Sequence, residues 1–181
     1  VLEGLTRIEE NGDVRPLLAQ SWSQDASALV HVFKLRRGVR FHDGAVLDAD
    51  TVRFSFERAK APGSTNKARK ALFDNIARID TPDAHTVVLN LERPDVHLLF
   101  RLGESTAVIL HPASAGQAAS HPVGTGPYRF GQWDRGQSIT LLKADTYRHA
   151  AQVGMERAVF HFIHDAKAQE AAFRSGSIDL F

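Results

Sequence analysis

The apolar residues of this chain of 181 residues come in short runs, and this feature constrains the possible folds most strongly. One of the longest unbroken runs, residues 107–110, is far below the ~20 apolar residues that a membrane-spanning helix needs. Turn signals such as Pro62-Gly63 and Asp134-Arg135-Gly136 separate the runs. The pattern predicts an α+β fold with mixed, mostly antiparallel sheets and flanking helices.

The strands are predicted from alternation of apolar and polar residues. In residues 29–36, the side chains of His31, Phe33 and Leu35 fall on one face of an extended chain. Pro82 and Asp83 favour a turn between two strands, and Gly136 favours another. Further strands are predicted at residues 76–80, 86–91, 107–110, 128–133, 138–143 and 158–163.

Helices are predicted where a capping residue precedes an apolar stripe. Asp48 can accept hydrogen bonds from the free amides of a first turn, and Val52, Phe56 and Ala59 follow at helical spacing. Asp165 stands in the same relation to a helix that ends near Gly176. Two further helices are predicted, at residues 67–75 and, starting from a proline, at residues 94–102.

Composition excludes several classes of function. The chain has 22 Lys and Arg against 21 Asp and Glu, a formal net charge of +1, which gives no basic footprint for nucleic acid. Because there is no cysteine, a disulfide scaffold, a thiolate metal site and a cysteine nucleophile are excluded. The composition therefore predicts an ordinary globular chain without a nucleic-acid partner.

No residue pattern predicts an enzyme. Among the nine histidines, the closest pair, His161 and His164, falls on opposite faces of a predicted strand, and no HExxH motif is present. Ser105 lacks a nucleophile elbow. Gly124-Thr125-Gly126 lacks the rest of a phosphate loop, and Pro127 has no amide hydrogen. We therefore predict no catalytic residue, no metal ligand and no cofactor.

A series of motifs resembles one known family. The long signature comprises residues 18–22, 32–44 and 48–56, and three later motifs follow in the same order at residues 123–128, at Asp145-x-Tyr147 and at residues 174–179. Together they resemble the family 5 extracellular solute-binding proteins, which are the peptide- and nickel-binding receptors of bacterial ABC importers. The resemblance runs nearly from end to end of the chain.

The resemblance implies a fold and a domain organisation. It implies the first lobe of a two-lobed, periplasmic-binding-protein-like fold of type II, cluster C. Residues 1–181 are expected to form part of lobe I, without lobe II; residues 1–30 and 122–181 contribute the main lobe sheet, and residues 31–121 an extra subdomain. The chain starts at Val1 rather than Met, so we expect either a removed targeting segment or an excised piece.

The resemblance also implies a function. It implies a substrate-binding protein that encloses a peptide or another small polar solute between two lobes and delivers it to the membrane permease. The expected location is the periplasm, or the cell exterior with a lipid anchor. By motif position, the candidate ligand-binding residues are Glu3, Gly4, Ser105, Thr106 and Tyr128. Gly4 alternatively permits a turn, and Tyr128 alternatively belongs to the core.

Several alternatives stay open at this point. The same lobe could be the ligand-sensing domain of a transcriptional regulator. It could also be a nickel-chelate receptor, although Arg69 stands where nickel-type members have a tryptophan, and Glu104-Ser105 where they have an arginine. The third alternative is a histidine-dependent metalloenzyme, which is disfavoured because His161 and His164 fall on opposite faces of the predicted strand. Sheet edges left without partner strands predict a dimer of the fragment.

Overall fold

The computed structural model describes all residues, Val1–Phe181. Every strand pair in it is antiparallel. The strands are β1 (Thr6–Ile8), β2 (Val14–Pro16), β3 (Ala19–Gln24), β4 (Val30–Leu35), β5 (Ile76–Asp83), β6 (Thr86–Leu91), β7 (Tyr128–Asp134), β8 (Ser138–Lys143) and β9 (Arg157–His161). The α-helices are α1 (Ala49–Lys60), α2 (Leu98–Arg101) and α3 (Ala166–Arg174), and short 3-10 helices lie at Phe73–Asn75, Ala115–Gln117 and Ala150–Gln152.

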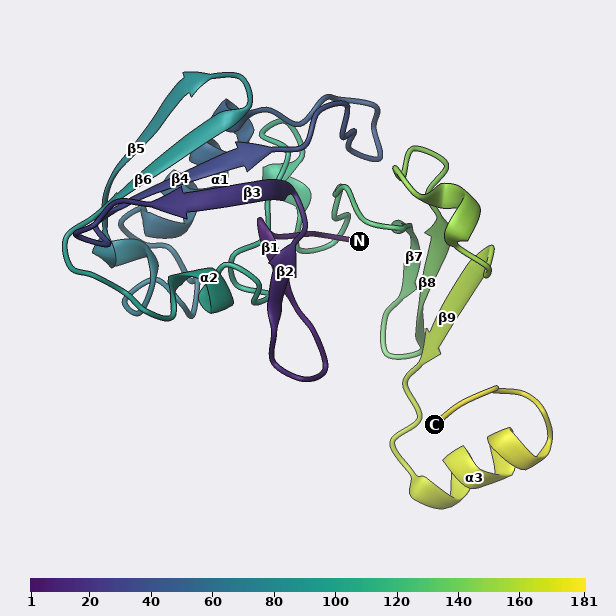
Figure 1. The fold of residues 1–181 in the computed structure, drawn as a ribbon. Helices are drawn as coiled ribbons and strands as arrows, with labels where there is room; N and C mark the ends of the chain where they lie inside the picture. The colour runs from purple at the N-terminus through teal and green to yellow at the C-terminus, as the bar shows by residue number, and fades with distance from the viewer.

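The largest sheet has four strands in the order β3-β4-β6-β5, and α1 lies along one of its faces (Figure 1). The alternation predicted for residues 29–36 is confirmed, since His31, Phe33 and Leu35 are buried and the residues between them are not. The β5–β6 hairpin is also confirmed, although β5 runs on to Asp83 and moves the turn two residues further. Strands β3 and β4 pair with each other, so this pairing joins residues from both sides of the predicted boundary at residue 30. The division of the lobe at residues 30 and 121 stays a prediction.

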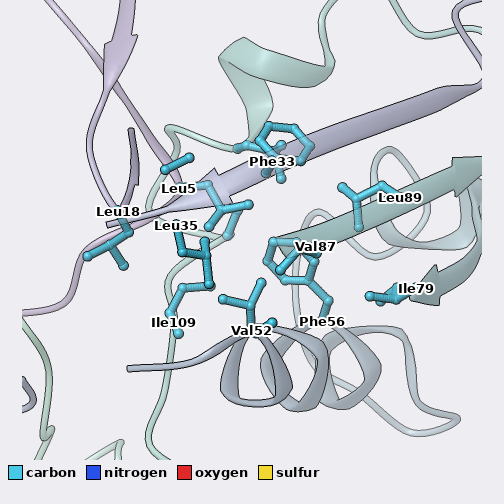
Figure 2. Close-up of a cluster of buried hydrophobic side chains, with 14 of the residues drawn as sticks. Leu5, Leu18, Phe33, Leu35, Val52, Phe56, Ile79, Val87, Leu89 and Ile109 are labelled. Carbon is cyan, nitrogen blue, oxygen red and sulfur yellow. The ribbon is translucent and has the colours of Figure 1, made fainter. Parts of the chain in front are cut away.

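The hydrophobic core lies between α1 and the four-stranded sheet. Figure 2 shows Val52 and Phe56 of α1 directed toward Phe33 and Val87 of the strands. The rings of Phe56 and Phe73 lie 5.5 Å apart. Burial of each such side chain contributes roughly 1.5–3 kcal/mol. All 23 residues of this core cluster fall within residues 5–109, so the stability of the chain is concentrated in its first two thirds.

Helix α1 begins and ends where the sequence predicts. The Asp48 carboxylate accepts hydrogen bonds from the backbone amide of Thr51 at 2.8 Å and from its hydroxyl at 2.6 Å. Ala61 leaves the helix with an extended backbone, because the ring of Pro62 disfavours the helical conformation in the residue before it. The Asp48 cap stabilises the N-terminal end of α1. That end lies nearest to the tip of the β5–β6 hairpin, where the Ala84 carbonyl accepts a hydrogen bond from the Ala49 amide.

Three predicted elements are wrong or shorter than expected. The helix predicted at residues 67–75 is a series of turns that ends in the 3-10 helix. Its start is diverted because the Asn66 side chain accepts the Ala68 amide and donates to the Thr106 carbonyl, both at 2.8 Å. Residues 107–110 form no strand. The Ile109 amide donates its hydrogen bond to the Glu3 carbonyl rather than to a neighbouring strand of a sheet. The helix predicted at residues 94–102 is reduced to α2.

Strands β7, β8 and β9 form a separate antiparallel meander beside the larger sheet (Figure 1). The β7–β8 hairpin is confirmed, and so is α3 with its cap, in which Asp165 accepts the Ala168 amide at 2.8 Å. This part of the chain has almost no buried apolar residue, and the side chains of Phe160 and Phe173 are 56% and 46% exposed. The strands at its edges have free hydrogen-bonding groups, and the dimer expected from such edges stays a prediction.

The longest α-helix, α1, has 12 residues. None of the helices combines the length and the hydrophobicity of a membrane span.

Candidate functional site

The first predicted site residue, Glu3, is held by other residues of the chain. Its carboxylate accepts two hydrogen bonds from the Arg148 guanidinium, both at 2.8 Å, and a third from the Thr125 hydroxyl at 2.7 Å. Burial alone would lower the pKa of Arg148, but the hydrogen bonds and the charge of Glu3 outweigh it and raise that pKa. The Glu3 carboxylate therefore joins the start of the chain to the segment after β8.

Gly4 owes its place to a close backbone approach. A Cβ atom at this position would lie 2.5 Å from the carbonyl oxygen of Leu102. The φ angle of Gly4 is not positive, so no left-handed turn requires a glycine here. The missing side chain lets the strand that follows Gly4 lie directly against the end of α2.

Two adjoining hollows open beside these residues. The larger has a volume of about 570 Å³ and the smaller about 440 Å³. They share Leu2, Ser105 and Val108 as lining residues. Glu3 and Gly4 line the smaller hollow. Thr106 lines the larger one, where its hydroxyl oxygen is buried without a hydrogen-bond partner. The structure therefore brings four of the five predicted residues to one surface, with Ser105 between the two hollows.

Tyr128 lies apart from the two hollows. It begins β7, its backbone is paired with Lys143 of β8, and its hydroxyl donates to the Met155 carbonyl at 3.1 Å. The hydroxyl therefore already has a partner within the chain, and Tyr128 lines neither hollow. Its assignment to ligand binding, like that of the other four residues, stays a prediction.

The charged residues of the hollows do not stand out in the sequence. Arg58 and Lys67 line the larger hollow, which has no acidic residue in its wall. In the smaller hollow, Arg7 is paired with Glu9 at 2.7 Å. In the sequence, Lys67 begins a short basic run at residues 67–70, which is typical of a solvated surface. Arg58 gave no signal, because α1 turns it toward residues that are far away in the sequence.

The Gly124-Thr125-Gly126 loop is a packing feature rather than a phosphate loop. A Cβ atom would lie 2.2 Å from the Val1 carbonyl oxygen at Gly124 and 2.8 Å from it at Gly126. His42 holds the loop from the other side, since its Nδ1 accepts the Gly124 amide at 3.3 Å and its Nε2 lies 2.9 Å from the Gly126 carbonyl oxygen. Both contacts are satisfied together by the neutral imidazole with its hydrogen on Nε2.

Burial governs the protonation of this histidine. It lowers the pKa of His42, because the charged imidazolium loses more hydration than its neighbours restore.

Elsewhere in the chain, no group of three His, Cys, Asp or Glu side chains is arranged to hold a metal ion. His161 lies on β9 and is exposed, as is His164 just beyond it.

Sequence comparison identifies the family. The family described as "Bacterial extracellular solute-binding proteins, family 5 Middle" matches residues 13–181. The glutathione-binding protein GsiB of Pectobacterium atrosepticum is 29% identical over 178 residues, which cover 96% of this chain and 34% of that protein. The chain therefore spans about a third of the length of this relative.

Solved structures confirm the fold. AgaA from A. tumefaciens R10, a periplasmic binding protein solved in complex with agropinic acid, matches 98% of this chain and 37% of its own with a TM-score of 0.91 and 31% identity. NikZ from Campylobacter jejuni, solved with Ni(L-His), matches 98% of this chain and 36% of its own with a TM-score of 0.89 and 29% identity. The predicted α+β fold of a periplasmic-binding-protein lobe is thus confirmed. The chain belongs to the bacterial extracellular solute-binding proteins of family 5.

Proposed function

We propose that these residues are the first-lobe part of the substrate-binding component of a bacterial ABC importer. The component captures a peptide or another small polar solute between two lobes and passes it to the permease subunits in the membrane. It binds its solute without transforming it. It acts in the periplasm, or outside the cell on a lipid anchor.

One observation supports this proposal most directly. The two hollows that meet at Ser105 form an open wall on a fold that superposes closely on AgaA. Polar side chains and buried apolar residues such as Phe73 line that wall together, which is typical of small-molecule sites. Such a wall becomes an enclosed site only when a second lobe covers it. Ligand drives closure because it gains contacts in the closed state that the open state lacks.

The similar proteins define the size and polarity of the solute to be tested. GsiB is named for glutathione, which is a tripeptide, and AgaA was solved with agropinic acid. A peptide-like solute is therefore our first candidate. A nickel chelate is the second, because NikZ was solved with Ni(L-His). A sensor role for the same lobe would show as a DNA-binding or signalling domain encoded upstream of Val1.

The test uses the complete reading frame that contains these residues. The purified full-length protein is titrated calorimetrically with glutathione, with dipeptides and with nickel–histidine, and we expect one of them to bind with a stoichiometry of one. Ser105→Trp fills the junction of the two hollows and should weaken that binding at least about tenfold. Ser23→Trp, on the exposed edge strand β3, is the matched control.

Two results would contradict the proposal. The first is a full-length protein that binds no solute in a broad panel and whose deletion leaves solute uptake by the parent cells unchanged. The second is a full-length protein that turns over a substrate.

A further inference from the structure

His42 is joined to the walls of the two hollows through one loop. Its backbone amide donates to the Gly124 carbonyl at 2.9 Å. Its side chain holds the same loop, because Nδ1 accepts the Gly124 amide at 3.3 Å and Nε2 lies 2.9 Å from the Gly126 carbonyl oxygen. His42 itself lines neither hollow. It therefore acts on the walls only through the residues that it holds.

The loop supports the segment that lines both hollows. The Gly126 amide donates to the Val1 carbonyl at 2.9 Å, and the Thr125 hydroxyl donates to the Glu3 carboxylate at 2.7 Å. Residues 1–4 line the smaller hollow, and the leucine among them also lines the larger one. A change in the position of the loop is consequently transmitted to both walls.

Protonation of the imidazole removes one of these contacts. The neutral ring with its hydrogen on Nε2 donates to the Gly126 carbonyl and accepts from the Gly124 amide. The imidazolium carries a hydrogen on each nitrogen, so its Nδ1 meets the Gly124 amide as donor against donor and the hydrogen bond is lost. In acid the loop is therefore held at one side of the ring only, with a repulsive contact at the other.

The surroundings of His42 keep it neutral until the pH is acidic. Burial is the largest influence on the pKa of His42 and lowers it, and the hydrogen bond to Gly126 offsets this in part. Glu3 is bound by Arg148, and Asp43 lies next to His111, with 2.8 Å between Oδ2 and Nδ1, so neither carboxylate forms an ion pair with His42. The charged groups that face the ring are the amino group of Val1, the carboxylate of Glu3 and the guanidinium of Arg129.

We propose that His42 is a positioning residue of the binding wall and that its protonation in acid lowers the affinity for the solute. The inference rests on the proposed function and adds a regulation by pH to the same site. The solute binds best to the wall that the neutral imidazole holds in place, so binding disfavours the protonated form. By linkage, the affinity is complete well above the His42 pKa of the free protein and decreases as the pH falls through that value.

The test measures affinity against pH on the full-length protein. The probes are glutathione and a panel of dipeptides. Calorimetric titrations are made at pH ~7 and pH ~5, because between them an α-carboxyl stays ionised and an α-amino group stays protonated. We expect a probe that binds to do so roughly three- to tenfold more weakly at the lower pH, tenfold being the effect of a one-unit difference in the His42 pKa between bound and free protein.

Variants assign the pH dependence to His42. His42→Gln supplies a donor and an acceptor without a charge and should bring the ratio of the affinities at the two pH values near one. His164→Gln removes an exposed histidine that lines neither hollow and should show the ratio of the unchanged protein. A purely structural role of His42 would weaken binding of His42→Gln at both pH values alike and leave the ratio as it is.

A second measurement does not depend on any variant. The imidazole signal of His42 in the unchanged protein is titrated by NMR with and without the probe. Because linkage is reciprocal, the bound probe should move the midpoint of this titration to lower pH. This result supports the inference even where His42→Gln does not bind the probe.

The outcomes separate this inference from the proposed function. If affinity does not fall in acid, if the fall persists in His42→Gln, or if the probe leaves the titration midpoint of His42 in place, the inference is overturned and the proposed function stands. If the full-length protein binds no solute of the panel at either pH, the inference is overturned together with the proposed function.

Discussion

Arg148 holds both carboxylate oxygens of Glu3, each at 2.8 Å, although 145 positions separate the two residues in the chain. The side chains are only 16% and 7% exposed. Glu3 precedes β1, and Arg148 follows β8 in the part of the chain that has almost no core of its own. The pair is therefore a main connection between the β7–β9 meander and the rest of the molecule.

Removal of the arginine should destabilise the chain strongly. Arg148→Ala leaves the Glu3 carboxylate buried with only the Thr125 hydroxyl as a side-chain donor, and breaking a buried pair in this way costs about 3–5 kcal/mol. The loss is read from urea unfolding. Arg174→Ala, which breaks an exposed pair with Glu170, is the control and should change stability by less than about 1 kcal/mol. Equal effects of the two variants would contradict the structural role of the Glu3–Arg148 pair.

A methyl group at Gly4 should be poorly tolerated. Gly4→Ala places Cβ 2.5 Å from the Leu102 carbonyl oxygen, and the backbone shift needed to relieve such a contact costs about 1–3 kcal/mol. The midpoint of thermal unfolding should fall accordingly. In the matched variant Gly154→Ala, Cβ would meet open space, and the midpoint should stay nearly unchanged. A tolerated Gly4→Ala would show that α2 does not pack as closely as described.

The contact between His42 and the Gly124–Gly126 loop should weaken in acid. Burial lowers the pKa of His42 in the folded chain, so the folded state binds a proton less readily than the unfolded chain, whose histidine pKa is about 6.5. The contribution of His42 to stability is therefore complete above pH ~6.5 and decreases as the pH falls toward the lower folded-state pKa. Protonated Nδ1 can no longer accept the Gly124 amide.

Unfolding free energies measured between pH 8 and pH 5, values chosen to bracket the ordinary histidine pKa, test this dependence. His42→Gln should flatten the decline in the pH range just below the ordinary histidine pKa. His164→Gln changes an exposed histidine and should leave the decline as it is. If the two variants show the same pH profile, His42 is not the group responsible.

The cap of α1 should contribute a measurable part of stability. Asp48→Ala removes the acceptor for the Thr51 amide and hydroxyl, and loss of such a cap costs about 1 kcal/mol, within a range of ~0.5–2. Glu57→Ala, at an exposed position of the same helix, should be neutral because alanine favours helices. Urea unfolding of both variants gives the comparison, and an unaffected Asp48→Ala would show that α1 is held by packing alone.

The fold was predictable where short-range signals and burial agree. The Asp48 and Asp165 caps, the alternation around Phe33 and the β7–β8 hairpin each depend on residues within about one helical turn or one hairpin of each other. The helix predicted at residues 67–75 failed because a distant partner, the Thr106 carbonyl, engages Asn66 at the start of the segment. Local propensity is a weak prior where such a tertiary contact competes with it.

The candidate site was predictable only in part. Motif position predicted Glu3, Gly4, Ser105, Thr106 and Tyr128 as ligand-binding residues. The structure has the first four around the two hollows and Tyr128 apart from them, and ligand binding by all five stays a prediction. Motif order could not show that the Glu3 carboxylate is already bonded to Arg148. It also gave no reason to place Arg58 in the same wall as Lys67.

By itself, the sequence determined the family, the antiparallel α+β character of the chain and most of its element boundaries, because these follow from spacing along the backbone. Only the tertiary structure decided which charges remain free. Arg148 pairs with Glu3, whereas Arg58 has no carboxylate partner and donates only to the Ala115 carbonyl. Both facts depend on distances across the fold that no local pattern encodes. Electrostatic interactions fall off steeply with separation and with exposure to water, so the chemistry of the two hollows became apparent only once the chain was folded.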